Sequence, residues 1–260
     1  MSTRLSVNVN KIATLRNARG GNNPDIVSLV KKIEDFGADG ITVHPRQDER
    51  HITLNDAYEI SKVVTTEYNI EGYPDNRFIK IVNDIKPEQV TLVPDAPDVV
   101  TSNRGWKKSD IDLDLSEVIS SIKKNGSKVS LFIDPTISMV DLALECGADR
   151  IELYTGTYAE FFKKDKYLAV KDYIESSEYA LSKGLDINAG HDLDLENLQF
   201  LKTSIPKIHE VSIGHALISD SLIFGLEETI KLYKSKIKSS DRKSTRLNSS
   251  HSSVSRMPSS

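Results

Sequence analysis

The 260-residue sequence has very little cysteine and no long hydrophobic run. Its only cysteine, Cys146, cannot form an internal disulfide, and its place in LALECGAD favours a small buried side chain at a helix end over a nucleophile. No stretch approaches the roughly 18 apolar residues of a membrane-spanning helix, and the N-terminus MSTRLSVNVNK lacks the pattern of a signal peptide. These absences predict a cytoplasmic protein without a membrane partner.

An excess of positive charge is also missing. The chain carries 34 Lys and Arg against 38 Asp and Glu, a formal net charge of −4. Because nucleic acids and anionic membranes attract basic surfaces, this balance argues against both as partners. Hydrophobic residues make up 38% of the sequence, enough to bury the core of one large α/β domain or of two smaller ones.

The composition changes in residues 241–260. This segment is rich in Ser and shows no hydrophobic periodicity, as in a disordered tail. Its stretches DRKSTRLNSSH and SRMPSS also look like translated sequencing-adapter reads, so we interpret the segment as an artefact of sequence assembly. We therefore expect a single catalytic domain over residues 1–240.

Short apolar runs rich in β-branched residues recur along this domain. They lie at residues 5–10, 41–44, 68–73, 89–94, 128–134, 150–155, 186–190 and 210–215. The segments between them show helical spacing, and two of these end at Gly126 and Gly147 as at a helix C-cap. Eight strand and helix units in about 235 residues predict a closed (β/α)8 TIM barrel rather than an open doubly wound sheet.

Two segments are longer than a plain barrel needs. Residues 93–114 form a loop rich in turn residues, which we expect to fold over one rim of the barrel. Residues 157–184, between the sixth and seventh strands, exceed one crossover helix. We expect the second segment to carry an added piece of structure.

Polar residues follow the apolar part of most of these runs. They are Asn8, Asn10, His44, Glu71, Asp134, Glu152, Asn188, His191 and His215. In a barrel the carboxyl ends of the strands meet at one rim, where the active sites of such barrels lie. Because buried polar groups cost free energy unless they are paired, so many at one rim predict a site there.

The histidines and glutamates of this rim favour proton transfer. His44, His51, His191 and His215 lie at or just past strand ends, whereas His209 precedes the eighth strand and is expected to be structural. Imidazoles titrate near neutrality, so a group of them suits repeated proton transfer. Glu71 and Glu152 would either transfer protons or hold a histidine in orientation.

Arginines and glycines near the rim predict anion binding. Arg19, beside flexible glycines, and Arg46, two residues past His44, favour a phosphate or carboxylate, whereas Arg50 favours a surface ion pair. Gly190 and Gly214 end the seventh and eighth strands, where barrels of this kind usually hold phosphate. The substrates should therefore be phosphorylated.

Missing motifs narrow the chemistry. Lys11 is the only lysine near a strand end, so the Schiff-base lysine of a barrel aldolase has no clear candidate. The sequence has no recognisable zinc, dinucleotide or P-loop motif, which predicts acid–base chemistry without a metal or cofactor. Two alternatives stay open: a phosphosugar epimerase or lyase that uses a metal or lysine, and a barrel that binds phosphometabolites without catalysis.

Several ordered stretches within residues 3–238 point to one family. They are VNVNKIATLRNARGG, GADGITVHPRQDERHIT, VSLFID, IELYTGTYAE, NAGH and IGHALI. Together they resemble the pyridoxine 5'-phosphate synthase family. The resemblance implies a TIM barrel with additional helices, assembled as a homo-octamer. It also implies condensation of 1-deoxy-D-xylulose 5-phosphate with 3-amino-2-oxopropyl phosphate, with release of phosphate and water.

The resemblance also implies residue roles. His44 and Glu71 would accept protons, His191 would donate one, and Glu152 would stabilise the transition state. The residues implied for the xylulose phosphate are Asn10, Lys11, Arg46, His51 and Thr101. The residues implied for the amino-oxopropyl phosphate are Asn8, Arg19, Gly214 and His215, and Asp192 is expected to bind substrate through its backbone.

The sequence departs from the family pattern at three places. Asn10-Lys11 replaces an Asp-His pair, so Asn10 must bind substrate without a charge and Lys11 would serve an oxygen. Tyr154 replaces a His, and Asp192 replaces the Gly that follows His191. Asp192 keeps its backbone N–H for substrate, but its carboxylate would repel a phosphate unless it points away.

Overall fold

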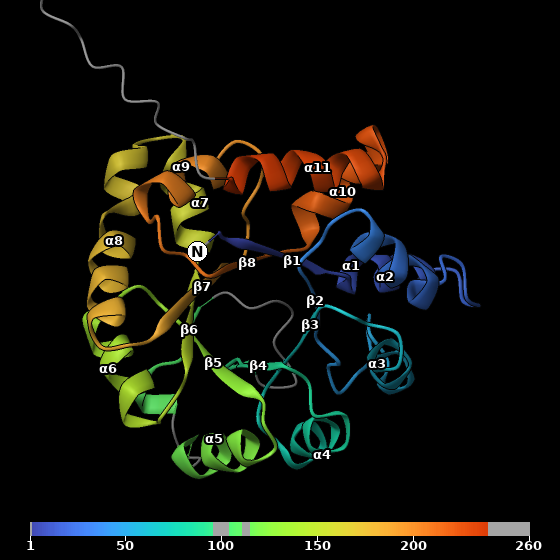
Figure 1. The fold of residues 1–260 in the computed structure, drawn as a ribbon, viewed down its shortest axis with the longest axis horizontal. Coiled ribbons are helices and arrows are strands. Elements are labelled where there is room, and N and C mark those ends of the chain that lie inside the picture. Colours follow the sequence, from blue (N-terminus) through green and yellow to red (C-terminus); the bar gives the residue numbers. More distant parts are fainter. Residues whose placement is uncertain (1, 96–103, 111–114, 239–260) are drawn as a thin grey trace, which may run out of the picture.

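The computed structural model describes residues 2–95, 104–110 and 115–238. Its strands pair in parallel and close into one barrel in sequence order, which confirms the predicted TIM barrel (Figure 1). The strands are β1 (Arg4–Asn8), β2 (Gly40–Val43), β3 (Glu67–Gly72), β4 (Gln89–Leu92), β5 (Lys128–Ile133), β6 (Arg150–Tyr154), β7 (Asp186–Gly190) and β8 (Glu210–Ile213). Each strand overlaps the apolar run that predicts it.

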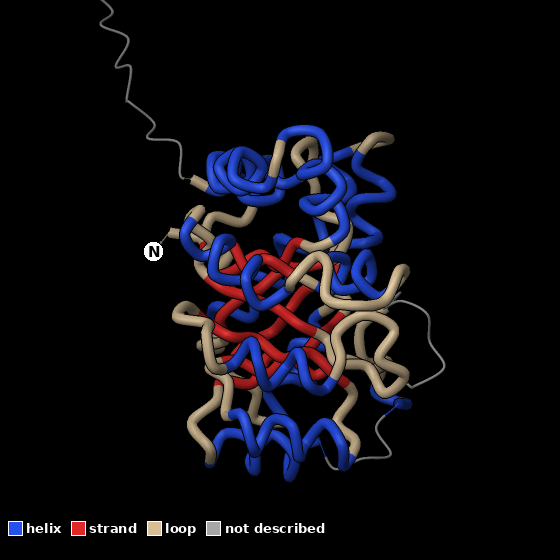
Figure 2. The backbone as a smooth tube through the Cα atoms, turned by 90° about the vertical axis from the view of Figure 1, so that its right-hand side faces the viewer, coloured by secondary structure: helices blue, strands red, loops and turns tan. Residues whose placement is uncertain are grey.

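Helices surround the barrel, with the strands inside them (Figure 2). They are α1 (Asn10–Asn17), α2 (Ile26–Asp35), α3 (Leu54–Ser61), α4 (Asn76–Ile85), η1 (Lys108–Asp110), α5 (Leu115–Lys124), α6 (Ile137–Glu145), α7 (Gly156–Phe162), α8 (Lys166–Ser182), α9 (Leu198–Ser204), α10 (His215–Phe224) and α11 (Leu226–Ile237). Two helices, α7 and α8, follow β6, and the shorter one is the added piece expected in residues 157–184. None of the helices in the described part of the chain has the length and apolar character that crossing a membrane requires.

Local signals in the sequence account for the helix ends. The Asp25 carboxylate accepts hydrogen bonds from the backbone N–H groups of Val27 and Ser28, which begins α2. Gly126 and Gly147, just past α5 and α6, have φ values of +95° and +79°. Glycine adopts this left-handed backbone without strain, which confirms both predicted C-caps.

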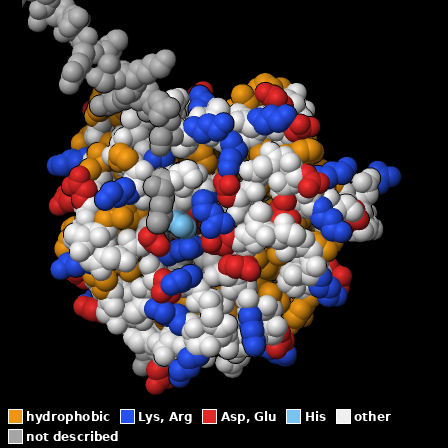
Figure 3. Space-filling model, viewed as in Figure 1, with side chains coloured by type: hydrophobic (Ala, Val, Ile, Leu, Met, Phe, Trp, Pro, Cys, Tyr) orange, Lys and Arg blue, Asp and Glu red, His pale blue; other side chains and the backbone are white. Residues whose placement is uncertain are grey.

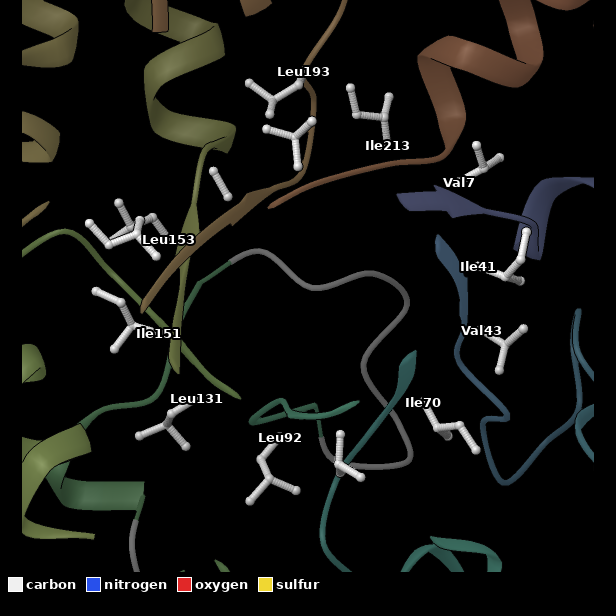
Figure 4. Packing of buried hydrophobic residues seen from close by; sticks show 14 of the residues in the cluster. Val7, Ile41, Val43, Ile70, Leu92, Leu131, Ile151, Leu153, Leu193 and Ile213 are labelled. Carbon is white, nitrogen blue, oxygen red and sulfur yellow. The ribbon is translucent and has the colours of Figure 1, made fainter. Parts of the chain in front are cut away.

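The apolar core lies between the barrel and the helices. Side chains such as Val7, Ile41, Ile70 and Leu131 are fully buried. Figure 4 shows them around the outside of the ring of strands. Because successive side chains of a strand point to opposite faces, the alternate residues point into the barrel.

The inside of the barrel is polar, unlike the branched apolar filling usual in this fold. Buried side chains form a hydrogen-bonded series across neighbouring strands: Ser6 Oγ lies 2.7 Å from Thr42 Oγ1, and Asn69 Nδ2 donates to Thr42 at 3.3 Å. Thr91 Oγ1 lies 3.0 Å from Asn69 Oδ1 and 3.4 Å from Glu152 Oε2. Polar residues therefore occupy the beginnings and middles of the strands as well as their ends.

Charged side chains close the other end of the barrel. Glu67 accepts ion-paired hydrogen bonds at 2.5 Å from both Arg4 and Arg150. His209 lies at this end, where its backbone carbonyl accepts from Arg4 N at 2.9 Å. This confirms that His209 is remote from the rim that follows the strand ends.

Two predictions fall largely outside the described residues. The expected tail, residues 241–260, is one of them, and of the expected cover of the rim by residues 93–114 the structure describes only 93–95 and 104–110. One described part is anchored to the barrel: Trp106 N donates to Phe132 O at 3.0 Å, and its indole donates to Leu92 O at 2.9 Å.

Candidate active site

A cavity of about 360 Å³ opens at the carboxyl ends of the strands. Among the residues that line it are most of the predicted site residues: Asn8, Asn10, Lys11, His44, Arg46, His51, Glu71, Glu152, His191, Asp192, Gly214 and His215. Figure 3 shows a histidine near the centre of one face, with acidic and basic side chains around it. The predicted convergence of polar strand ends at one rim is confirmed for most of them, whereas Asp134 and Asn188 are not among the lining residues: Asp134 accepts from Gly105 N and Asn188 donates to Gln89.

Not every candidate lines this cavity. Arg19 is exposed just past α1, and Thr101 lies outside the described residues. Arg16, also close to the rim in sequence, is buried in a two-armed ion pair with Asp56, at 2.6 and 2.7 Å. Its role in the fold is to tie α1 to the start of α3.

His44 and His51 lie together on one side of the cavity, with their ring centroids 6.1 Å apart. Asn10 Oδ1 accepts a hydrogen bond from His44 N at 3.0 Å, which fixes the end of β2. Burial, with the nearby charge of Arg46, holds the pKa of His44 well below its usual range. The same two causes lower the pKa of His51 to about 4. Both imidazoles are therefore neutral near pH 7 and able to accept protons.

Two arginines line the cavity beside these histidines. Arg46 is buried, and its Nη2 lies 2.5 Å from the buried carboxylate of Asp95. Arg50 pairs at 2.5 Å with Asp48, and both of these side chains are partly exposed. The ion pair expected for Arg50 is thus present. Asp95 holds Arg46 and was not anticipated from the sequence, although it shortly follows the end of β4.

Two carboxyl groups line the cavity from β3 and β6: Glu71 is partly buried and Glu152 is buried. Burial, followed by the charge of Glu152, raises the pKa of Glu71 well above its usual range. Burial raises the pKa of Glu152 to about 7, while the hydrogen bond from Thr91 and the charge of His191 oppose the shift. Asn8 Nδ2 donates to Glu71 Oε2 at 3.4 Å. Because each charge disfavours the other, at least one carboxyl holds a proton near neutrality.

His191 lies just past β7 and lines the same cavity as His44. Its Nδ1 lies 2.9 Å from Asp192 Oδ2, and its ring meets the Tyr154 ring edge at a centroid distance of 5.1 Å. The hydrogen bond to His191 lowers the pKa of Asp192, against the effect of burial. The carboxylate of Asp192 thus has a protein partner.

The eighth strand leads directly into a helix N-terminus at the cavity wall. Gly214 precedes α10, and His215 is the first residue of that helix. A Cβ atom on Gly214 would come within 3.1 Å of Asn8 Cβ, so glycine allows the close approach of β1 and β8. Free backbone N–H groups at a helix start favour an anion, as the sequence predicts for this place.

No metal cluster accompanies these groups. Among residues 2–95, 104–110 and 115–238, no three His, Cys, Asp or Glu side chains are arranged to hold a metal ion. The cavity contains neutral imidazoles, a protonated carboxyl group, a buried guanidinium and a helix N-terminus. This set can move protons and bind anions.

Comparisons with known proteins find related sequences over nearly the whole chain. The family model of the pyridoxal phosphate biosynthesis protein PdxJ matches residues 5–239. Pyridoxine 5'-phosphate synthase from Cytophaga hutchinsonii is 58% identical over 91% of this chain and 99% of its own length. The synthase from Porphyromonas gingivalis is 54% identical over 90% of this chain and 99% of its own.

A solved structure is similar in fold alone. Thiamine phosphate pyrophosphorylase from Pyrococcus furiosus superposes with a TM-score of 0.58 at 11% identity, covering 90% of this chain and 95% of its own. The low identity limits this likeness to the barrel architecture.

Proposed function

Because the chain belongs to the pyridoxine 5'-phosphate synthase family, we propose that it condenses 1-deoxy-D-xylulose 5-phosphate with 3-amino-2-oxopropyl phosphate by acid–base catalysis. The products are pyridoxine 5'-phosphate, phosphate and water. The observation that carries this proposal is the meeting of His44, Glu71, Glu152 and His191 at one cavity. Ring closure from two small ketones needs several proton transfers, which these groups can supply.

The proposed sequence begins with an imine between the amine of one substrate and the ketone of the other. Eliminations and an aldol-type ring closure follow. His44, neutral through burial, accepts a proton, and Glu71 accepts another when its carboxyl is ionised. His191 donates a proton, and Glu152 stabilises charge that develops between them. The substrate amine takes the place of an enzyme lysine in the imine.

The proposed binding of the xylulose phosphate uses the His44 side of the cavity. Arg46 offers paired donors that Asp95 holds in place, and His51 and Lys11 lie nearby. Because Asn10 Oδ1 already accepts from His44 N, its Nδ2 is the group that would donate to a substrate oxygen. Thr101 completes this proposed set by resemblance.

The proposed binding of the amino-oxopropyl phosphate uses the part of the rim where β7, β8 and β1 end. Its phosphate would lie at Gly214 and His215, where the start of α10 supplies N–H donors. Asn8 and the backbone N–H of Asp192 would contact the rest of the substrate. Arg19, which is exposed in the single chain, would reach this phosphate only after a rearrangement or from a second copy.

We also propose that residues 1–240 form the catalytic domain of a cytoplasmic homo-octamer. Neighbouring helices α1 and α10 each expose large apolar side chains, namely Leu15, Leu222 and Ile223. Exposed apolar surface of this kind is typical of contacts between subunits. Light scattering on the purified protein, with Ile223→Glu as a variant that should weaken assembly, tests the oligomer.

The activity test supplies both substrates to purified protein without added metal. Growth of a pyridinol absorbance is expected. Activity that appears only with a divalent cation, or only with a single phosphosugar, would favour the epimerase or lyase alternative. Folded protein that binds the substrates without turnover would favour the non-catalytic alternative.

A further inference from the structure

The imidazole of His191 is bonded to the side chain of the next residue. Nδ1 of His191 lies 2.9 Å from Oδ2 of Asp192. Both side chains line the cavity, and they are 29% and 53% exposed. Within the described residues this is the only hydrogen bond to the ring, so Nε2 is left for a group in the cavity.

The backbone fixes this pair. His191 and Asp192 have φ values of +87° and +55°, a left-handed backbone that residues other than glycine seldom adopt. Thr155 Oγ1 lies 2.7 Å from Gly190 O and 2.5 Å from His191 O, and Asn197 Nδ2 donates to Asp192 O at 3.0 Å. A strained turn persists where its surroundings hold it, so these contacts keep the carboxylate on the imidazole.

Other groups face the pair without bonding the ring. The Glu152 carboxyl on β6 and the His215 imidazole on α10 interact with it electrostatically, and Tyr154 packs its ring edge against His191. Asp134 and Glu160 lie around Tyr154. Asp192 is the group placed to set which nitrogen of His191 carries hydrogen.

We propose that Asp192 is a positioning residue, whose carboxylate holds Nδ1–H of His191 so that Nε2 presents the proton to the substrate. This deepens the proposed function, because it rests on His191 as the proton donor. It also gives a role to an Asp that stands where the family pattern has glycine.

The proton balance of the step is simple. The His191 imidazolium gives its Nε2 proton to the substrate atom and becomes neutral, with Nδ1–H still bonded to Asp192. The carboxylate of Asp192 remains ionised throughout and stabilises the imidazolium before transfer. Nε2 then regains a proton from solvent or from a later substrate step.

Two substitutions separate the charge from the hydrogen bond. Asp192→Asn removes the charge and keeps an oxygen acceptor, while Asp192→Gly removes both. Asn and Gly tolerate the left-handed backbone of this position, so the turn should survive. Glu196→Gln is the matched control, since it removes a carboxylate of the same loop that pairs with Lys163 instead.

The first measurement is ¹⁵N NMR of histidine rings in the full chain without substrate, with His191→Asn used to assign the signal. The midpoint of the His191 signal should lie at lower pH in Asp192→Asn than in the wild type, because the anion that favours the imidazolium is gone. In Asp192→Gly the neutral ring should also lose its Nδ1–H form. The control should leave the midpoint and the tautomer as they are in the wild type.

The second measurement is the pH dependence of kcat. The alkaline limb should move to lower pH in Asp192→Asn by the same amount as the NMR midpoint, with KM for both substrates nearly constant. An unchanged midpoint and tautomer in Asp192→Gly would overturn the proposal, as would a rise in KM with unchanged kcat. If the wild type forms no pyridinol, the proposed function fails, whereas the NMR result still decides the pairing.

Discussion

A Cβ atom on Gly190 would overlap Oε1 of Glu152, so the absence of a side chain on β7 makes room for the buried carboxyl on β6. The two residues lie on the neighbouring strands β7 and β6, where Glu152 pairs in register with Asn188. The place of Glu152 in the cavity therefore depends on a glycine that does not line it.

Gly190→Ala should displace the Glu152 carboxyl and lower kcat by about 10- to 100-fold, because small misplacements of a reacting group are costly. Steady-state kinetics and thermal unfolding measure the two effects. The double variant Gly190→Ala/Glu152→Asp shortens the acid and should recover part of kcat. If Gly190→Ala showed wild-type kinetics, the position of the Glu152 carboxyl would not depend on Gly190.

Glu152→Gln should stabilise the protein more at pH 8 than at pH 5. Burial raises the pKa of Glu152 from an ordinary 4.5 to about 7. The unfolded chain loses this proton at lower pH than the folded one, so wild-type stability falls as the pH rises from about 4.5 to 7. Gln stays neutral at both pH values. The variant therefore avoids the loss of about 2 to 3 kcal/mol in the free energy of unfolding that ionisation of Glu152 causes. Chemical unfolding at both pH values tests this, and a difference independent of pH would contradict it.

His191→Asn should abolish most turnover, with a fall in kcat of about 10²- to 10⁴-fold, because proton donation is lost. Substrate binding measured by calorimetry should be nearly intact. His209→Asn is the control, since His209 lies at the opposite end of the barrel and should leave kcat close to wild type. A large loss of affinity with little change in rate would contradict the donor role.

Arg46→Lys should raise KM for the xylulose phosphate by about tenfold with a smaller effect on kcat, because lysine keeps the charge but loses the paired donors. The retained charge also avoids leaving the buried Asp95 carboxylate without a cation. Arg50→Lys is the matched control, since Arg50 already pairs with Asp48. Equal effects of the two substitutions on KM would argue against a special role of Arg46.

Arg16→Met should lower the free energy of unfolding by about 3 to 5 kcal/mol, because it leaves the buried Asp56 carboxylate without its partner. Arg50→Met removes a partly exposed ion pair and should cost about 1 kcal/mol or less. Although burial opposes it, hydrogen bonds from Arg16 and Thr53 hold the pKa of Asp56 below 3.8. The Arg16→Met deficit should therefore shrink as the pH falls below that value, which urea unfolding can follow.

The fold was predictable because its signals are local and repeated. Apolar runs of strand length alternate with helical spacing eight times, and single residues such as Asp25 and Gly126 mark helix ends through their own backbone preferences. The sequence also predicted that His44, Glu152 and His191 lie close together, since the carboxyl ends of parallel strands in a closed barrel must meet.

The sequence did not predict which side chains contact each of these site residues. Asp95 reaches Arg46 across 49 positions of sequence, and Thr91 reaches Glu152 across 61. The pattern of apolar runs ending in polar residues does not predict the polar filling of the barrel, because the inward positions of each strand are polar from its start. Only the direction in which alternate side chains point reveals this.

The sequence by itself determined the succession of strands and helices and the residue types that arrive at the rim. Tertiary structure decided which of them are buried, which is why two imidazoles stay neutral while at least one of the two carboxyl groups retains a proton. Burial removes the water that stabilises charge, and that loss depends on neighbours brought together from the whole chain. The residue types come from the sequence, and their protonation comes from the fold.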